Sequence, residues 1–171
     1  MELWDIYNAH GERTGRTVSR EAWSPASGEY HLAASAIIVN SAGEILCSHR
    51  APEKRHRPDM WEVCVGSAQA GEDSLRAIRR ELREELGLDI PPEDLTFFYR
   101  AWDGDCIRDT FLCRRELDPA SLILQPEETD CAAWFPFASW ERMARAGEIL
   151  IPATPDDEAF YAALREEIRM R

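Results

Sequence analysis

The chain of 171 residues has no long apolar run, and its first sixteen residues, MELWDIYNAHGERTGR, are polar. A membrane-spanning helix needs about 20 predominantly apolar residues, and a secretory leader needs an apolar stretch near the start of the chain. We therefore expect neither a membrane span nor a leader, and we expect a cytoplasmic protein.

Basic residues are also scarce, because 20 Lys and Arg stand against 32 Asp and Glu, for a formal net charge of -12. A protein that binds nucleic acid through its phosphates needs clustered Lys and Arg. We therefore expect no nucleic-acid partner. The charge does not exclude a nucleotide whose phosphates are bridged by a metal ion.

Paired cysteines are absent, since the five cysteines form an odd, scattered set with no CxxC motif. Such a set argues against a disulfide framework and against a zinc site. We expect reduced thiols, most of them small core residues. These residues are Cys47, Cys64, Cys106, Cys113 and Cys131.

The chain contains alternating strand and helix patterns, with no repeats or linkers. Turn residues at 8–11 predict an opening hairpin. Apolar runs predict the other strands, and two amphipathic patterns predict closing helices. The expected strands span residues 3–7, 13–18, 31–39, 44–49, 61–65, 95–101, 106–114 and 131–135, and the closing helices span 138–146 and 156–170. We expect one α/β domain over residues 1–171, with a mixed sheet between helices.

The segment 66–88 reads GSAQAGEDSLRAIRRELREELGL and contains a further amphipathic helix. Either Ser74 or Asp73 is positioned to cap its start, and Gly87 follows its last turn as a C-terminal cap. Its arginines, at positions 76, 79, 80 and 83, are expected mainly on one flank. The buried stripe is expected to contain Leu75, Ile78, Leu82 and Leu86.

Three carboxylates, Glu81, Glu84 and Glu85, fall within a sector of roughly 100° on the opposite flank. Like charges at this spacing repel one another, so the cluster costs stability unless a cation or arginines offset it. Carboxylate oxygens are the ligands that Mg²⁺ and Mn²⁺ prefer. A metal site is one interpretation, and a solvated face with Glu–Arg pairs is the other.

The spacing of the fixed residues in this segment resembles the signature of the Nudix hydrolases. The matching residues are Gly66, Glu72, Arg80, Glu81, Leu82, Glu84, Glu85, Gly87 and Leu88. The resemblance implies a Nudix-type α/β/α sandwich in which Glu81, Glu84 and Glu85 bind Mg²⁺ or Mn²⁺. It also implies hydrolysis of a P–O–P bond in a small nucleoside di- or triphosphate or related diphosphate. By analogy with the family, a homodimer is possible.

The other signature residues have structural interpretations. Gly66 is expected to let the backbone turn tightly after the strand at 61–65, and Gly71 to do the same before the helix. Arg80 is positioned to pair with Glu72 and hold the loop against the helix.

The first half of the chain also resembles the Nudix branch related to isopentenyl-diphosphate isomerase, which gives isomerisation of an allylic diphosphate as an alternative function. That enzyme needs a cysteine and a glutamate beside its substrate. Here His31 matches a metal histidine, but Ser67 replaces another and Val65 replaces the catalytic cysteine, with Cys64 one position away. Arg108 and Thr110 stand where the isomerase has glutamates, so we favour the hydrolase.

The catalytic base has three candidates: Glu84 and Glu85 from the helix, and Glu128 from the loop before the strand at 131–135. A third functional hypothesis is a non-catalytic diphosphate-binding module, which the complete carboxylate set disfavours.

Substrate phosphates have a small set of candidate ligands. The only dense basic run is Lys54, Arg55, His56 and Arg57, and Arg50 precedes it. Guanidinium and ammonium groups form charge-assisted bonds with phosphate. The alternative is a solvated loop. His31 is a further candidate, although a lone histidine in an apolar strand is more often structural.

Overall fold

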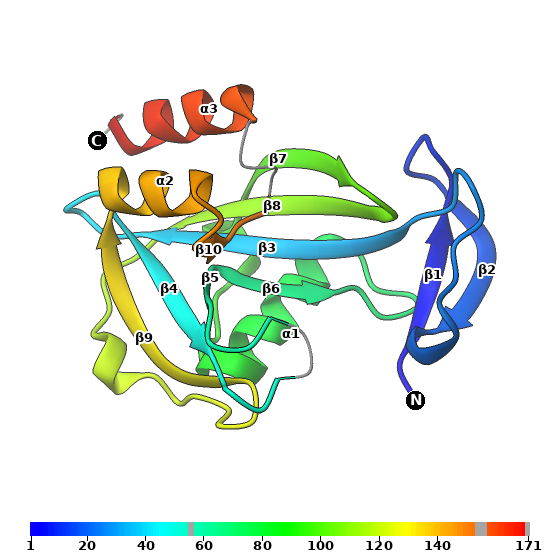
Figure 1. Cartoon of the computed structure of the whole chain (residues 1–171), viewed down its shortest axis with the longest axis horizontal. Helices are drawn as coiled ribbons and strands as arrows, with labels where there is room; N and C mark the ends of the chain where they lie inside the picture. Colours follow the sequence, from blue (N-terminus) through cyan, green and yellow to red (C-terminus); the bar gives the residue numbers. More distant parts are fainter. Residues whose placement is uncertain (55–56, 153–156, 170–171) are drawn as a thin grey trace.

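A mixed sheet lies between one helix on one face and two helices on the other (Figure 1). The structure is a computed structural model that describes residues 1–54, 57–152 and 157–169. The predicted α/β/α sandwich is therefore confirmed. Arg55 and His56 of the basic run lie outside the described residues.

The central strand is β3 (His31–Val39), which pairs in parallel with β8 (Cys106–Arg114) along its whole length. Its first half also pairs with β6 (Cys64–Ser67), whereas its end pairs with β4 (Glu44–Arg50). This change of partner splits the sheet beside β3. The outer strands are β7 (Thr96–Asp103) on β8, β5 (Trp61–Glu62) and β9 (Thr129–Pro136) on β4, and β10 (Ile149–Leu150) on β5.

The prediction of a single strand at 61–65 is wrong, because this segment belongs to two strands, β5 and β6, with Val63 between them. β5 pairs with β4, and β6 pairs with β3. Val63 packs in the core on one face of the sheet, whereas Cys64 packs in the core on the other face. The segment changes partner while it keeps the alternation of a strand, which leads the chain across the sheet toward the helix α1 (Ser74–Leu86).

α1 covers one face of the sheet, where its apolar stripe is buried as predicted except for the partly buried Leu75. Asp73 is the N-terminal cap, since its Oδ1 accepts a hydrogen bond from the Arg76 N–H at 2.8 Å. Gly87 ends the helix at a φ of +66°, where a Cβ would lie 2.7 Å from the Cβ of Ile123. Both caps agree with the sequence analysis.

The opposite face is covered by α2 (Phe137–Arg145) and α3 (Glu158–Arg169). Trp140, Phe160 and Leu164 are fully buried there. The predicted ends of the last helix, residues 156 and 170, lie outside the described residues. The other predicted helix and strands are present, with ends that differ by at most two residues.

The N-terminal hairpin of β1 (Leu3–Tyr7) and β2 (Arg13–Ser19) is a separate two-stranded sheet at one end of the molecule (Figure 1). It contacts the loop before α1, since the Ala70 N–H donates to the Leu3 carbonyl at 2.7 Å. The Gly71 N–H donates to Asp5 Oδ2 at 2.9 Å. The hairpin therefore fixes the loop that carries the signature residues.

All five cysteines are free thiols, and only Cys131 is exposed. Within the described residues, no helix has both the length and the apolar character that a bilayer crossing requires.

Candidate functional site

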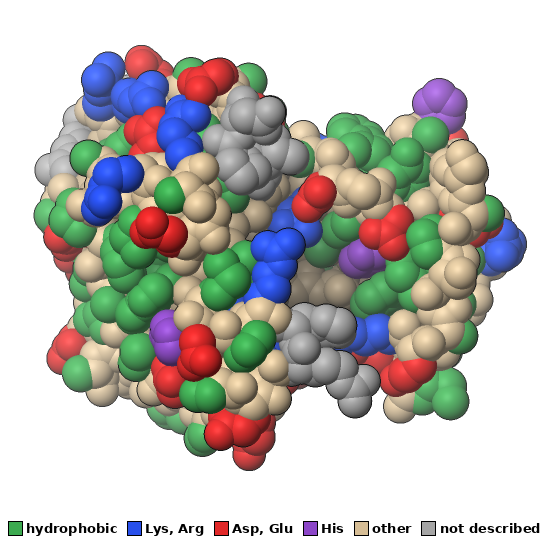
Figure 2. Space-filling model, in the orientation of Figure 1, with side chains coloured by type: hydrophobic (Ala, Val, Ile, Leu, Met, Phe, Trp, Pro, Cys, Tyr) green, Lys and Arg blue, Asp and Glu red, His purple; other side chains and the backbone are tan. Residues whose placement is uncertain are grey.

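A polar cavity of about 650 Å³ lies between α1, the hairpin and the first residues of β3 and β8. Figure 2 shows the molecule hollowed between the hairpin on the right and the larger body on the left. The cavity brings together most residues that the sequence singled out. They are His31, Arg50, Lys54, Gly66, Arg80, Glu81, Glu84, Glu85 and Glu128.

Gly66 is required for a different reason from the one predicted. It lies inside β6, and its backbone is not in the left-handed region. A Cβ on Gly66 would lie 2.1 Å from Cδ of Glu81, far inside van der Waals contact. The tight turn is instead at Gly71, with a φ of +88°. The missing side chain of Gly66 therefore makes room for the Glu81 carboxylate against the sheet.

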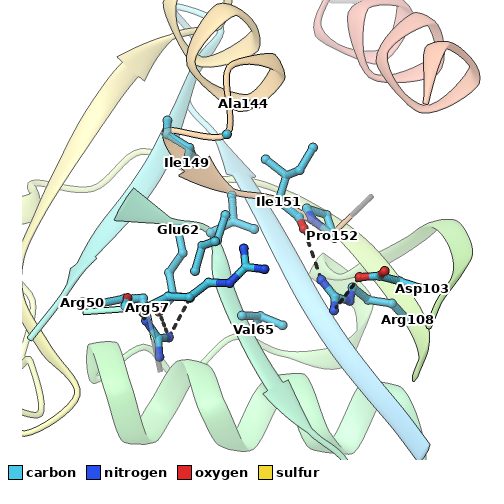
Figure 3. Close-up of a pocket in the computed structure, with 13 residues that line it drawn as sticks. Arg50, Arg57, Glu62, Val65, Asp103, Arg108, Ala144, Ile149, Ile151 and Pro152 are labelled. Carbon is cyan, nitrogen blue, oxygen red and sulfur yellow. Dashed lines mark hydrogen bonds and ion pairs between the residues drawn. The ribbon is translucent and has the colours of Figure 1, made fainter. Parts of the chain in front are cut away.

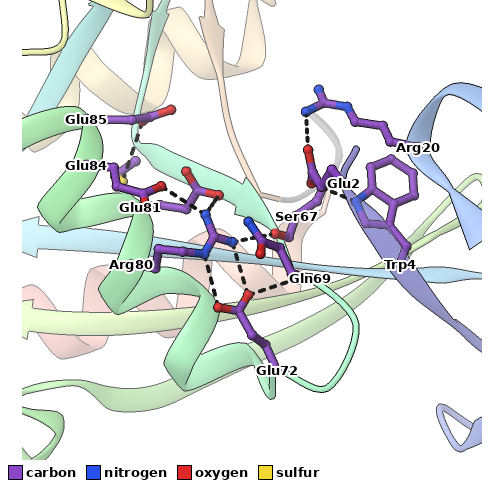
Figure 4. Close-up of polar contacts among 11 residues, drawn as sticks. Glu2, Trp4, Arg20, Ser67, Gln69, Glu72, Arg80, Glu81, Glu84 and Glu85 are labelled. Carbon is purple, nitrogen blue, oxygen red and sulfur yellow. Dashed lines mark hydrogen bonds and ion pairs between the residues drawn. The ribbon is translucent and has the colours of Figure 1, made fainter. Parts of the chain in front are cut away.

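Arg80 connects the loop, the strand and the carboxylates (Figure 4). Its Nε and Nη2 bind the two oxygens of Glu72 at 3.0 and 3.1 Å, which confirms the predicted pair. Nη2 also donates to the Ser67 carbonyl at 3.0 Å. Nη1 binds Glu81 at 2.7 Å and Glu84 at 3.2 Å. The prediction that the arginines lie mainly on the flank away from the carboxylates does not hold for Arg80, because it precedes Glu84 by four residues and therefore faces the same side of the helix.

Glu85 is the most deeply buried of the three helix carboxylates, with 8% of its surface exposed. Burial, reinforced by the charges of Glu81 and Glu62, raises its pKa to about 8. Burial also raises the pKa of Glu81. The charged form of each group is disfavoured by desolvation and by like charges nearby. The site thus has negative charge that its cationic side chains do not fully offset.

Glu128 and Lys54 form an ion pair at the cavity wall. Burial, followed by the charge of Arg50, lowers the pKa of Lys54. Lys54 thus contacts a carboxylate of the cavity and itself lines the cavity. The structure places Glu128 in the same cavity as the α1 carboxylates, although it lies more than 40 positions later in the chain.

Arg50 forms a buried pair with Glu62, a residue that the sequence analysis missed. The Arg50 Nη1 lies 2.7 and 2.9 Å from the two carboxylate oxygens, and Glu62 is 3% exposed. Burial raises the pKa of Glu62, and Arg50 opposes that effect. A single carboxylate in the otherwise apolar segment WEVCV was the available signal.

His31 is packed between aromatic rings at the hairpin. Its ring stacks on Trp4 at 4.3 Å between centroids and meets Trp23 edge-on at 5.7 Å. Burial lowers its pKa, which favours the neutral form. Beside it, the Trp4 indole N–H donates to Glu2, and Glu2 pairs with Arg20 at 3.0 Å (Figure 4). His31 therefore has a structural role and also borders the cavity.

Of the residues considered for isomerisation, His31, Val65, Ser67 and Arg108 line the cavity, whereas Cys64 and Thr110 do not. Cys64 packs in the core, and burial raises the pKa of its thiol well above the usual value. Thr110 is buried, and its Oγ1 lies 3.0 Å from the Ser35 hydroxyl. Cys106 also lines the cavity; the sequence analysis gave this thiol no role in the site, and burial raises its pKa to about 11. The described site thus places no thiol at the position that the isomerase uses.

The donor set has the chemistry that a hard divalent cation prefers, although among the described residues no three of these carboxylates bring their oxygens within 4.8 Å of one another. The side chains of Glu81, Glu84, Glu85 and Glu128 supply carboxylate oxygens to one cavity. Burial is the main cause of the raised pKa values of Glu81 and Glu85, and a cation placed among them would favour their charged forms. Mg²⁺ and Mn²⁺ bind such oxygen ligands and are commonly shared with substrate phosphates.

Comparisons with known proteins agree with this geometry. A model of the NUDIX domain matches residues 29–163. An uncharacterised Nudix hydrolase of Listeria monocytogenes is 33% identical over 154 residues, which cover 88% of this chain and 89% of that protein.

Two further relatives define the limits of the similarity. An isopentenyl-diphosphate isomerase of Escherichia coli is 38% identical over 113 residues, which cover 63% of this chain and 61% of that enzyme. A crystal structure from Deinococcus radiodurans superposes with a TM-score of 0.72 at 22% identity, covering 96% of this chain and 98% of that one. The first likeness is partial, and the second shows the fold.

Proposed function

Because this chain belongs to the Nudix hydrolase family and is a Nudix pyrophosphohydrolase, we propose that it uses Mg²⁺ or Mn²⁺ to cleave a small nucleoside di- or triphosphate or related diphosphate. The ion would be held by Glu81, Glu84 and Glu85. The observation that carries the proposal is the clustering of these carboxylates with Glu128 in one cavity.

The protein's own residues prepare this site in three ways. Gly66 leaves space for Glu81. Arg80, anchored by both oxygens of Glu72, orients the carboxylates of Glu81 and Glu84. Buried Glu85 retains a proton near neutral pH until a cation enters, because its pKa is about 8. When bound, the ion neutralises charge on the diphosphate and lowers the pKa of the attacking water.

The general base is proposed to be a carboxylate of this cavity, either Glu84 or Glu85 on α1, or Glu128 opposite. The ion pair with Lys54 supports Glu128, because it restricts that side chain to the cavity wall. Replacement of the base by glutamine removes the proton acceptor and preserves the shape of the side chain. A loss of turnover by orders of magnitude in Glu85→Gln, with Glu128→Gln nearly unaffected, would exclude Glu128.

The function is tested by phosphate and pyrophosphate release across nucleotides, nucleotide sugars, dinucleotides and prenyl diphosphates. The blank is Glu84→Gln/Glu85→Gln protein, and the matched control is Glu93→Gln, an exposed glutamate outside the cavity. We expect metal-dependent turnover that the double variant loses and the control retains.

Two results would overturn the proposal. Conversion of isopentenyl diphosphate to its dimethylallyl isomer, without hydrolysis of any compound, would establish the isomerase alternative. Metal binding with no turnover in the whole panel would favour a binding module over the proposed activity.

A further inference from the structure

A second cavity of about 490 Å³ adjoins the carboxylate cavity (Figure 3). The two cavities share the lining residues Arg50, Val65, Asp103 and Arg108. A ligand whose diphosphate lies among the α1 carboxylates can therefore extend past Val65 into this second space. Its volume falls within the range of small-molecule sites.

The walls of this second cavity are mainly aliphatic. Among the described residues that line it, none has an aromatic ring. A nucleotide base usually stacks on an aromatic or guanidinium plane, and its recognition commonly uses such rings. Among the described lining residues such planes come only from the arginine guanidiniums, and the rest of the wall suits an aliphatic chain or the carbon frame of a sugar. The apolar residues are Val63, Val65, Ala144, Ile149, Leu150, Ile151 and Pro152.

Arg57 extends its guanidinium into the middle of this cavity, between Val65 and Ile151 (Figure 3). Its backbone has a φ of +50°, a conformation that side-chain-bearing residues seldom adopt. The Arg57 carbonyl accepts a hydrogen bond from Arg50 Nε at 3.0 Å, which holds this backbone in place. Within the described part of the chain, no carboxylate or carbonyl pairs with the Arg57 guanidinium.

Arg108 reaches the same space from β8. Its Nη1 donates to the Ile151 carbonyl at 3.2 Å, and its Nη2 lies 3.4 Å from Asp103. Its Nε is buried and has no hydrogen-bond partner among the described residues. The exposed part of the Arg108 side chain, 22% of its surface, is what a ligand in the cavity can contact.

The charges of the cavity leave a local positive excess in a chain with a net charge of -12. Arg50 is offset by Glu62 at 2.7 Å, whereas Asp103 offsets Arg108 only at 3.4 Å. Arg57 adds a further positive charge. Guanidinium groups match the paired oxygens of a phosphate or carboxylate.

We propose that this cavity binds a second anionic group, carried on a non-aromatic frame, of the diphosphate substrate. Arg57 and Arg108 contact the anion, and the aliphatic wall contacts the frame. The inference rests on the proposed hydrolase function and narrows its substrate class to diphosphates with a second phosphate or carboxylate.

The test compares two diphosphates on five-carbon frames. 5-Phosphoribosyl diphosphate carries a second phosphate, and isopentenyl diphosphate does not; ADP supplies an aromatic base. We expect the highest kcat/KM for the first compound. We expect Arg57→Ala to lower that value about tenfold or more, mainly through KM, with partial recovery in Arg57→Lys. The control is Arg76→Ala, whose side chain is 74% exposed on the outer surface of α1.

A binding measurement separates this inference from the function itself. Ribose 5-phosphate is titrated into metal-free protein and followed by NMR, with ribose as the neutral reference. Suppose that ribose 5-phosphate binds more weakly to Arg57→Ala than to wild type, and that wild type hydrolyses no compound of the panel. That result would uphold the anion site and refute the hydrolase. Hydrolysis with no preference for the phosphorylated compound, and with no effect of Arg57→Ala, would refute the anion site and leave the hydrolase intact.

Discussion

Replacement of Glu85 by glutamine tests the electrostatic state of the carboxylate cluster. The substitution keeps the shape of the side chain and removes its charge. Glu85 is 8% exposed, and burial with the charges of Glu81 and Glu62 raises its pKa from 4.5 to about 8. In the metal-free protein, the ionised Glu85 therefore opposes folding.

The sign of the pH dependence follows from linkage. The folded protein holds the Glu85 proton more tightly than the unfolded chain does. The stability that the protonated Glu85 contributes relative to the ionised form is therefore complete below pH 4.5. It is lost as the pH rises to about 8. The difference in pKa corresponds to at most about 5 kcal/mol. The pKa of about 8 already includes the attraction of Lys54 and Arg50, and relaxation of the cluster with entry of water lowers the cost of the ionised carboxylate further, so we expect about 1 to 3 kcal/mol.

The assay is urea unfolding of wild-type and Glu85→Gln protein with EDTA at pH 5 and pH 9. We expect the variant to be more stable at pH 9 by about 1 to 3 kcal/mol, with a smaller difference at pH 5. Added Mg²⁺ should stabilise the wild type at pH 9 and leave the variant nearly unchanged. A variant that is less stable than wild type at pH 9 in EDTA would refute this account of the cluster.

Three other substitutions test the supporting contacts. Gly66→Ala places a Cβ against Glu81, so we expect a loss of about 1 to 3 kcal/mol in unfolding free energy and weaker metal binding, measured by urea melts and calorimetry. Arg80→Lys retains the charge but cannot bind both oxygens of Glu72; we expect lower kcat, and wild-type kinetics would contradict the orienting role. Asp73→Ala removes the α1 cap and should cost about 1 kcal/mol with unchanged kcat, whereas a drop in kcat at full folding would show that the cap also orders the site.

Much of the fold was predictable because local patterns determine it. The period of apolar residues located α1, Gly87 marked its end, and the start was placed at either Ser74 or Asp73, of which Asp73 is the cap. The strand at 61–65 was predicted as one element because an apolar run does not reveal a change of pairing partner. That change depends on β3 and β4, which are distant in the sequence.

The site was predictable where its residues lie on one helix, and less so where contacts come from several elements. The carboxylate spacing located Glu81, Glu84 and Glu85 on one side of α1. The contact of Arg80 with Glu84 follows from their spacing of four residues, whereas its hydrogen bond to the Ser67 carbonyl depends on the strand packed beside the helix. The Arg50–Glu62 pair and the aliphatic cavity around Arg57 require the packed sheet.

Direct binding of Mn²⁺, followed by electron paramagnetic resonance at pH 8, tests the central claim that the α1 carboxylates hold a divalent ion. The proteins compared are wild type, Glu84→Gln/Glu85→Gln and Glu93→Gln. We predict that the double variant weakens Mn²⁺ binding about 100-fold or more and that Glu93→Gln binds as wild type does. Equal Mn²⁺ affinity in all three folded proteins would contradict the account.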